Sequence, residues 1–201
     1  VDGDFLIEIP VKQSGLYMDM TESRFDFESG AASRTVSMST NLSFWNVLEK
    51  PSWVSVSPES GEAGEHTLTI NVEDNPNTTK REGRVVVGNQ GLSLADTLWL
   101  TQEGKWFGSL ETVLQFENVA SSNTLDISTD GDWTVTTSDS WIAVNPSSGH
   151  GKAQVTVSVQ ANEGDNDRTG LLAVAVGGTV QYVNVVQKGR YFTIDRGSSA
   201  F

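Results

Sequence analysis

The sequence predicts an all-β protein made of two β-sandwiches in tandem, each with Greek-key connections. Short segments alternate apolar and polar residues, as strands do when one face is buried, and residues 68–72 and 155–159 are the clearest examples. Clusters of Gly, Pro, Asn, Asp and Ser bound these segments, and no long stretch shows the apolar period of a helix. The same order of motifs also occurs twice along the chain.

The first expected element is an added strand near the amino terminus. Phe5, Ile7, Ile9 and Val11 occupy alternate positions within an amino-terminal segment, 1–23, that precedes the repeated region. The alternation predicts a strand that joins one of the sheets.

The strands of the two repeats follow in the same order. In the first repeat we expect strands to contain residues 36–38, 45–47, 53–57, 68–72 and 92–100. In the second repeat the corresponding segments are 125–127, 133–135, 141–145 and 155–159, followed by the apolar run 171–176. About seven short strands per repeat at this spacing favour a Greek-key sandwich.

The repeat is defined by tryptophan, arginine, glutamine and glycine. Trp45 lies eight residues before Trp53, and Trp133 lies eight residues before Trp141. A Ser-Gly pair follows, then Arg-x-Gly, and Gln-x-Gly closes each copy. The paired residues are Gly61 and Gly149, Arg81 and Arg168, Gly83 and Gly170, Gln102 and Gln187, and Gly104 and Gly189. The spacing between the paired residues of the two copies suits a whole small domain rather than a solenoid unit.

These motifs predict the domain boundaries. We expect one sandwich at 24–104 and the other at 110–189, joined by a short aromatic linker at 105–109. The remaining residues, 190–201, form a tail that resembles the start of a further repeat.

Aromatic pairs follow the closing glycine of each repeat. They are Trp106 with Phe107 and Tyr191 with Phe192. We expect both pairs to pack between consecutive domains and, with so short a linker, to stiffen the array.

The motifs occur in a fixed order: Trp-x-Val, Ser-Trp-[Val/Ile]-x-Val-x-Pro-x-Ser-Gly, Val-Thr-Val-x-Val, Arg-x-Gly and Gln-x-Gly. With this order of motifs, the chain resembles tandem BACON domains (Bacteroidetes-associated, carbohydrate-binding, often N-terminal). The second copy is the cleaner match, whereas the first departs at 41–49 and is longer at 92–100. The resemblance implies immunoglobulin-like sandwiches without catalytic residues. It also implies an exported protein, periplasmic or at the cell surface, with a lipid anchor upstream of Val1 as one form of attachment.

Composition excludes several functions. The chain has 13 basic and 26 acidic residues among 201, a net charge of −13, which disfavours nucleic acid and anionic lipid as partners. Cysteine is absent, so disulfides and cysteine-based zinc sites are excluded. No apolar run approaches the ~20 residues of a membrane helix, and direct membrane insertion is not expected.

Most tryptophans are expected in the interior. The strand pattern places Trp45, Trp133, Trp53 and Trp141 in the two cores. Trp99 differs, because inward-facing Leu98 and Leu100 would turn it outward, where the second repeat has Asn184.

Two aromatic side chains are candidates for ligand binding. They are Trp99 and, in the second repeat, Tyr182. An outward aromatic ring could stack on a sugar or pack on a neighbouring segment, and large exposed apolar groups usually mark contacts. We therefore favour packing for Trp99.

The sequence predicts neither a cofactor nor an enzyme. Glu163, Asp165 and Asp167 space side-chain oxygens at alternate positions, but the loop lacks the full calcium-binding pattern and is a weak metal candidate. The two histidines lie in no recognisable catalytic motif.

Two functions remain open. The favoured hypothesis is a non-catalytic spacer or protein-interaction module that contacts other domains or proteins at a cell surface. The alternative is weak binding of a glycan or mucin by a module attached to a polysaccharide-processing system.

Overall fold

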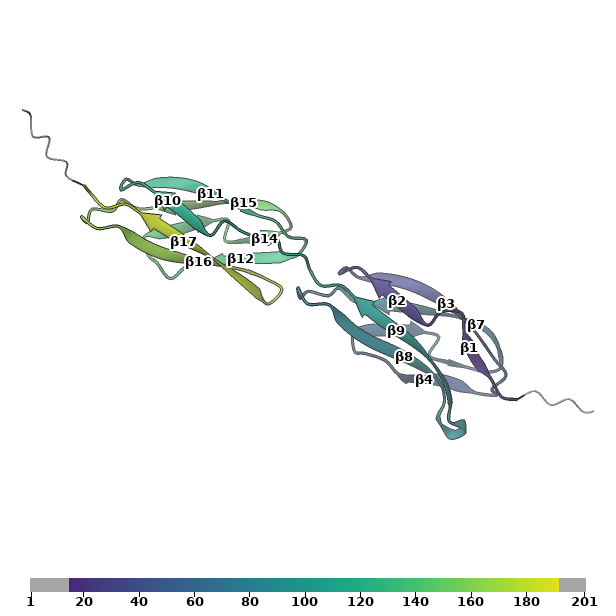
Figure 1. Ribbon diagram of the computed structural model, residues 1–201. Coiled ribbons are helices and arrows are strands. Elements are labelled where there is room, and N and C mark those ends of the chain that lie inside the picture. The colour runs from purple at the N-terminus through teal and green to yellow at the C-terminus, as the bar shows by residue number, and fades with distance from the viewer. Residues whose placement is uncertain (1–14, 192–201) are drawn as a thin grey trace, which may run out of the picture. The chain divides into compact units, whose positions relative to one another are not determined.

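The computed structural model describes residues 15–191 (Figure 1). Within them the single helical element is a short 3-10 turn, η1 (Gln90–Leu92), and all other regular elements are strands. The chain divides into two compact units, the first ending at residue 101 and the second starting at 102, with 28–30 and 74–81 grouped with the second. The strand expected at 5–11 and the side chain of Phe192 lie outside the described residues.

The first unit is a sandwich of two sheets. Its strands are β1 (Met18–Met20), β2 (Arg24–Phe27), β3 (Ala32–Thr40), β4 (Trp45–Glu49), β5 (Val54–Ser57), β6 (Ser60–Gly61), β7 (Gly64–Val72), β8 (Arg81–Asn89) and β9 (Leu94–Gln102). One sheet has the order β1-β3-β7-β5 and the other β2-β9-β8-β4-β6. The chain therefore changes sheets between β1, at the end of the amino-terminal segment 1–23, and β2, at the start of the first repeat.

The second unit repeats this plan. Its strands are β10 (Val113–Phe116), β11 (Ser121–Ile127), β12 (Asp132–Thr136), β13 (Ile142–Asn145), β14 (Ser148–His150), β15 (Ala153–Val159), β16 (Arg168–Val176) and β17 (Thr179–Gln187). The sheets have the orders β11-β15-β13 and β10-β17-β16-β12-β14. Within the second sheet β10 runs parallel to β17, whereas β16 and β17 form an antiparallel hairpin. The all-β, immunoglobulin-like sandwich expected from the sequence is confirmed.

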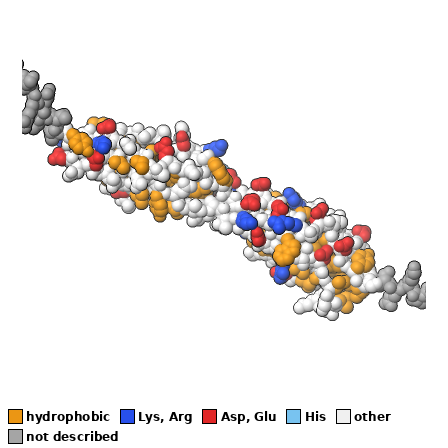
Figure 2. All heavy atoms as spheres, viewed as in Figure 1, with side chains coloured by type: hydrophobic (Ala, Val, Ile, Leu, Met, Phe, Trp, Pro, Cys, Tyr) orange, Lys and Arg blue, Asp and Glu red, His pale blue; other side chains and the backbone are white. Residues whose placement is uncertain are grey.

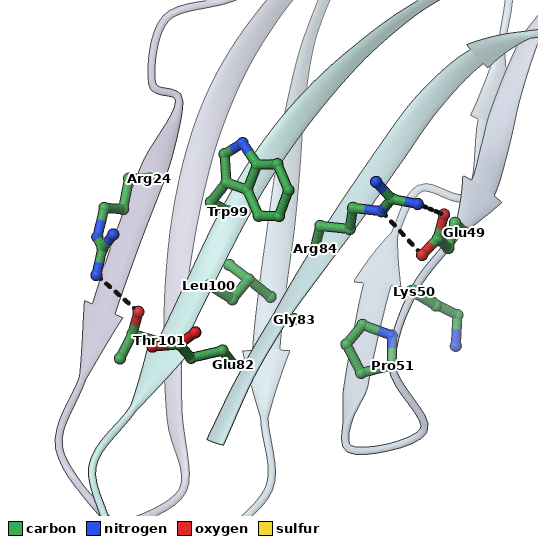
Figure 3. A pocket seen from close by; sticks show the side chains of 10 residues that line it. All are labelled: Arg24, Glu49, Lys50, Pro51, Glu82, Gly83, Arg84, Trp99, Leu100 and Thr101. Atoms are coloured by element: carbon green, nitrogen blue, oxygen red, sulfur yellow. Dashed lines mark hydrogen bonds and ion pairs between the residues drawn. The ribbon is translucent and has the colours of Figure 1, made fainter. Parts of the chain in front are cut away.

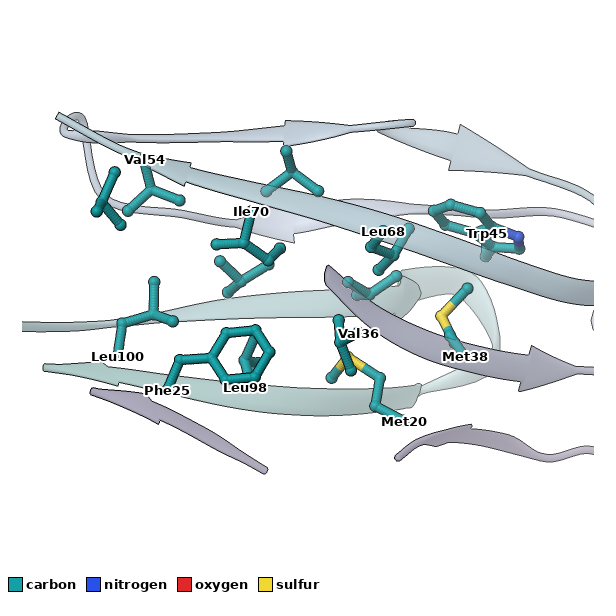
Figure 4. Packing of buried hydrophobic residues seen from close by; sticks show 14 of the residues in the cluster. Met20, Phe25, Val36, Met38, Trp45, Val54, Leu68, Ile70, Leu98 and Leu100 are labelled. Carbon is teal, nitrogen blue, oxygen red and sulfur yellow. The ribbon is translucent and has the colours of Figure 1, made fainter. Parts of the chain in front are cut away.

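Each unit encloses its own apolar core. In the first, Leu68 and Ile70 from one sheet meet Leu98 and Leu100 from the other (Figure 4), and all four side chains are almost completely buried. Equivalent alternation buries Val155, Val157 and Val159 on β15 together with Val183 and Val185 on β17. The period of two in the sequence thus becomes the inner face of each sheet.

Trp45 and Trp133 lie in these cores as expected. Their exposed fractions are 0% and 2%, and their indole N–H groups donate to the carbonyls of Glu62 and Gly151. A buried indole requires such a partner, and the chain supplies it from the loop that follows β6 or β14.

Trp53 and Trp141 correct the prediction, because both are only partly buried at the edge of their cores. The following residues, Val54 and Ile142, begin strands and point inward, so each tryptophan packs beside the core. The guanidinium of Arg168 lies 4.2 Å from the centre of the Trp141 ring and covers it.

The closing glutamine of each repeat ties together several backbone segments. Gln187 is fully buried, and its amide nitrogen donates to the carbonyls of Glu117, Val119 and Gln160. Its side-chain oxygen accepts a hydrogen bond of 2.9 Å from Nε of Arg168. The Arg and Gln motifs are therefore framework residues that satisfy buried polar groups.

Candidate functional site

The outer face of the β2-β9-β8-β4 sheet carries an open hollow in the first unit. Trp99 is 52% exposed between the buried Leu98 and Leu100, the outward orientation expected from alternation. The indole borders this open hollow of about 510 Å³. Figure 3 shows the indole between Arg24 on β2 and Arg84 on β8. The volume lies within the range of about 300–1,000 Å³ that is usual for small-molecule sites.

A forked ion pair forms one side of the hollow. Nε and Nη2 of Arg84 donate to the two carboxylate oxygens of Glu49 at 2.9 and 2.8 Å. The guanidinium carbon of Arg84 also lies 5.8 Å from the centre of the Trp99 ring. Hydrogen bonding to Arg84 lowers the pKa of Glu49, and hydrogen bonding to Glu49 raises the pKa of Arg84. Both groups are therefore charged over the ordinary pH range.

The remaining basic side chains of the hollow are also paired. Arg24 donates from Nε to Asp26 at 2.9 Å and from Nη2 to the hydroxyl of Thr101 at 2.8 Å. Nζ of Lys50 lies 3.8 Å from a carboxylate oxygen of Glu59. Figure 2 shows acidic and basic side chains interspersed on the visible face of this unit. The hollow thus presents an aromatic face bordered by hydrogen-bonding groups of balanced charge.

The glycine in the hollow has a structural explanation. A Cβ on Gly83 would lie 2.4 Å from Cγ of Pro51 and 3.2 Å from the ring of Trp53. The Arg-x-Gly motif therefore lets the Pro51–Trp53 segment pack against β8, and this glycine is not evidence of a ligand.

The second candidate, Tyr182, occupies a different setting in the other repeat. It is 58% exposed on β17, pairs across the hairpin with Ala173, and lies on a sheet that also exposes Leu171 and Val180. The structure does not bring Tyr182 into the Trp99 hollow, and the two candidates belong to different repeats.

Residues 105–108 are part of the second unit. Phe107 forms a β-bridge with Thr129 and packs partly buried against the second core. Trp106 is 54% exposed, and Tyr191 is 68% exposed with its hydroxyl bonded to Asp167. Packing of Trp106, Phe107, Tyr191 and Phe192 between domains stays a prediction.

The weak metal candidates have other partners. Glu163 accepts from Arg190 at 2.9 Å, and Asp167 accepts from Tyr191, Lys188 and the backbone N–H of Gly189. These contacts lower the pKa of Asp167 to about 2, the Tyr191 hydroxyl contributing most. Over residues 15–191, no three His, Cys, Asp or Glu side chains gather closely enough to hold a metal ion. Over the same residues, no helix has the length and apolar character to cross a membrane.

One feature of the hollow escaped the sequence analysis. Glu49 and Arg84 are 35 residues apart, and their pairing depends on the adjacency of β4 and β8. The sequence signal was the contrast between repeats, because the second repeat lacks an equivalent charge at both positions.

Comparison with known families identifies both repeats. Residues 109–190 match the BACON_2 model, described as "Viral BACON domain", and residues 43–103 match the BACON model, described as "Putative binding domain, N-terminal".

Individual relatives share only part of the chain. The xyloglucan-specific endo-beta-1,4-glucanase BoGH5A of Bacteroides ovatus is 29% identical over 89 residues, which are 42% of this chain and 18% of that enzyme. The solved Bacteroides ovatus GH5 xyloglucanase in complex with a XXXG heptasaccharide is 27% identical, and the match covers 43% of this chain and 19% of that one at a TM-score of 0.40. The I67–I69 fragment of titin is 9% identical, with 89% and 66% of the chains covered and a TM-score of 0.34.

The chain thus spans about a fifth of the length of the enzyme it matches. The family assignment rests on the two adjacent family matches and on the shared Trp, Arg and Gln framework. The chain belongs to the BACON family and carries two of its domains in tandem.

Proposed function

We propose that the chain is a non-catalytic spacer and binding module of an exported or cell-surface protein that processes polysaccharide. The observation that carries the spacer function is the parallel pairing of the first and last strands of the second repeat. Val113 lies beside Asn184 and Phe116 beside Gln187, so the chain enters at one end of the sandwich and leaves at the other. Gln181 on β17 hydrogen-bonds the backbone of Gly108 and Leu110, so the chain enters beside residue 181, and the nine residues from there to 190 span about 30 Å when extended.

The families matched support the non-catalytic part of this proposal, because one of them is described as a binding domain. The glucanase relative supports the polysaccharide context through its name, and most of that enzyme lies beyond the part similar to this chain. A rigid module between other domains would keep them apart without taking part in a reaction.

A distance measurement tests the spacer function. The chain has no cysteine, so spin labels at Ser109→Cys and Arg190→Cys report on the second repeat alone. We expect a narrow distribution near 30 Å. Replacing 110–189 with a Gly/Ser segment of equal length should broaden it strongly, because such linkers are random coils. A short distance in the intact chain, with both labels at one end, would rule out the spacer geometry.

A second candidate function is saccharide binding at the Trp99 hollow. An exposed indole can cover the apolar face of a sugar ring, while Arg84 and Glu49 supply donors and acceptors for hydroxyl groups. The name of the glucanase relative, specific for xyloglucan, favours this ligand class over a peptide.

Titration calorimetry with xyloglucan oligosaccharides and mucin glycans tests this candidate. Trp99→Ala should weaken binding at least tenfold, or about 1.4 kcal/mol. Tyr182→Ala removes an equally exposed aromatic ring in the other repeat and should leave affinity unchanged. Full binding by Trp99→Ala would place any saccharide site elsewhere.

A further inference from the structure

The two repeats differ at the positions that form the Trp99 hollow. Counted from the shared motifs, Arg84 and Leu171 each follow the motif arginine by three residues. Trp99 and Asn184 each precede the closing glutamine by three residues, and Glu49 and Thr137 each follow the core tryptophan by four. The aromatic face and the charged fork of the first repeat thus correspond to Asn, Leu and Thr in the second.

This contrast separates the requirements of the fold from those of the hollow. The second repeat forms the same sheet, β10-β17-β16-β12-β14, with neutral residues at all three positions. Glu49 and Arg84 are about half exposed, and exposed ion pairs contribute little to stability. The sandwich therefore forms without the Glu49–Arg84–Trp99 group, and the ion pair within that group adds little stability.

The pairing of charges decides which ligand the group suits. Arg84 is paired with Glu49, Arg24 with Asp26, and Lys50 lies near Glu59, so an anion at any of these cations would also lie close to a carboxylate that repels it. The net charge of −13 also repels anions at long range. A sugar hydroxyl both donates and accepts, and can therefore bind beside Arg84 and Glu49 without separating them.

The arrangement of side chains adds a constraint on shape. The indole of Trp99 lies between Arg24 and Arg84 (Figure 3), so a ring stacked on it would direct its edges toward both. A pyranose with equatorial hydroxyls has an apolar face for the indole and polar edges for the two arginines. We infer that the first repeat alone binds a neutral, equatorially hydroxylated sugar chain at Trp99, Arg84 and Glu49, an inference that rests on the saccharide-binding proposal.

The test exchanges the three residues between repeats. Glu49→Thr, Arg84→Leu and Trp99→Asn, combined, install the residues that the second repeat tolerates in the same fold. The probes are a neutral xyloglucan oligosaccharide and an oligogalacturonate, titrated at low and high salt. We expect the wild type to bind the neutral probe with little salt dependence, and the triple variant to lose at least tenfold in affinity with an unchanged unfolding midpoint.

The outcomes distinguish this inference from the broader proposal. Tighter binding of oligogalacturonate that high salt abolishes would overturn the neutral-sugar inference and leave saccharide binding intact. Neutral-sugar binding that survives the triple exchange would overturn the location. If neither probe nor any other glycan binds, the saccharide function itself fails, and this inference fails with it.

Discussion

At the scale of single residues, each sandwich places a glycine against its buried tryptophan. A Cβ on Gly61 would lie 2.8 Å from the ring of Trp45, and one on Gly149 would lie 2.5 Å from the ring of Trp133. Neither glycine has a positive φ, and both lie in short strands paired with the tryptophan strand. The Ser-Gly motif therefore reflects close packing of a strand on an indole, whereas its sequence alone is typical of a turn.

This packing predicts a large effect of a single methyl group. Gly61→Ala should lower the free energy of unfolding by about 1–3 kcal/mol, the usual cost of overpacking, because the fully buried ring of Trp45 has no free space to move into. Urea denaturation measures the change. Gly30→Ala is the matched control, since its Cβ would meet no atom within 4 Å, and it should stay within about 0.5 kcal/mol. Equal stability of the two variants would contradict this account of the motif.

At the scale of elements, strand alternation predicted which side chains face inward. It placed Leu98 and Leu100 inside and Trp99 outside, because successive side chains of a strand point to opposite faces of the sheet. It failed for Trp53 and Trp141, which precede their strands and so escape the alternation. The pairing of Glu49 with Arg84 was also beyond prediction, since it needs the order of the strands in the sheet and an irregular register between Val47 and Glu49.

The loop after β15 and the chain after β17 form an acid-resistant contact. The folded pKa of Asp167 is about 2, below its ordinary 3.8, so its stabilising contribution is fully present above the ordinary value and is lost as pH falls through about 2. We expect an NMR titration of this carboxylate to have its midpoint near 2, and Tyr191→Phe to raise it. Tyr182→Phe, which changes a tyrosine on β17 that does not contribute to the lowered pKa of Asp167, should leave the midpoint in place. An unshifted midpoint in Tyr191→Phe would assign the lowered pKa to Gly189 and Lys188 instead.

At the scale of the whole molecule, the chain contains two copies of one framework with different outer faces. The shared Trp, Gly, Arg and Gln residues were visible in the sequence as a repeat, and this is why the fold class and the family could be predicted before the structure. The arrangement of the outer face of the first repeat could not be predicted from the sequence, because its residues belong to no shared motif. They come together only in the folded sheet, where strands β2, β9, β8 and β4 lie side by side.

Two separate cores predict two separate unfolding events in the intact chain. Leu68 and Leu172 are both fully buried, one in each core, and replacing either with alanine should cost about 2–5 kcal/mol in the repeat that contains it. In differential scanning calorimetry, Leu68→Ala should lower the midpoint of one transition and Leu172→Ala that of the other, because neither side chain belongs to the opposite core. Each variant serves as the control for the other. If both substitutions lower the same transition by the same amount, the repeats unfold as one cooperative unit, and a spacer made of independently stable modules would have to be abandoned.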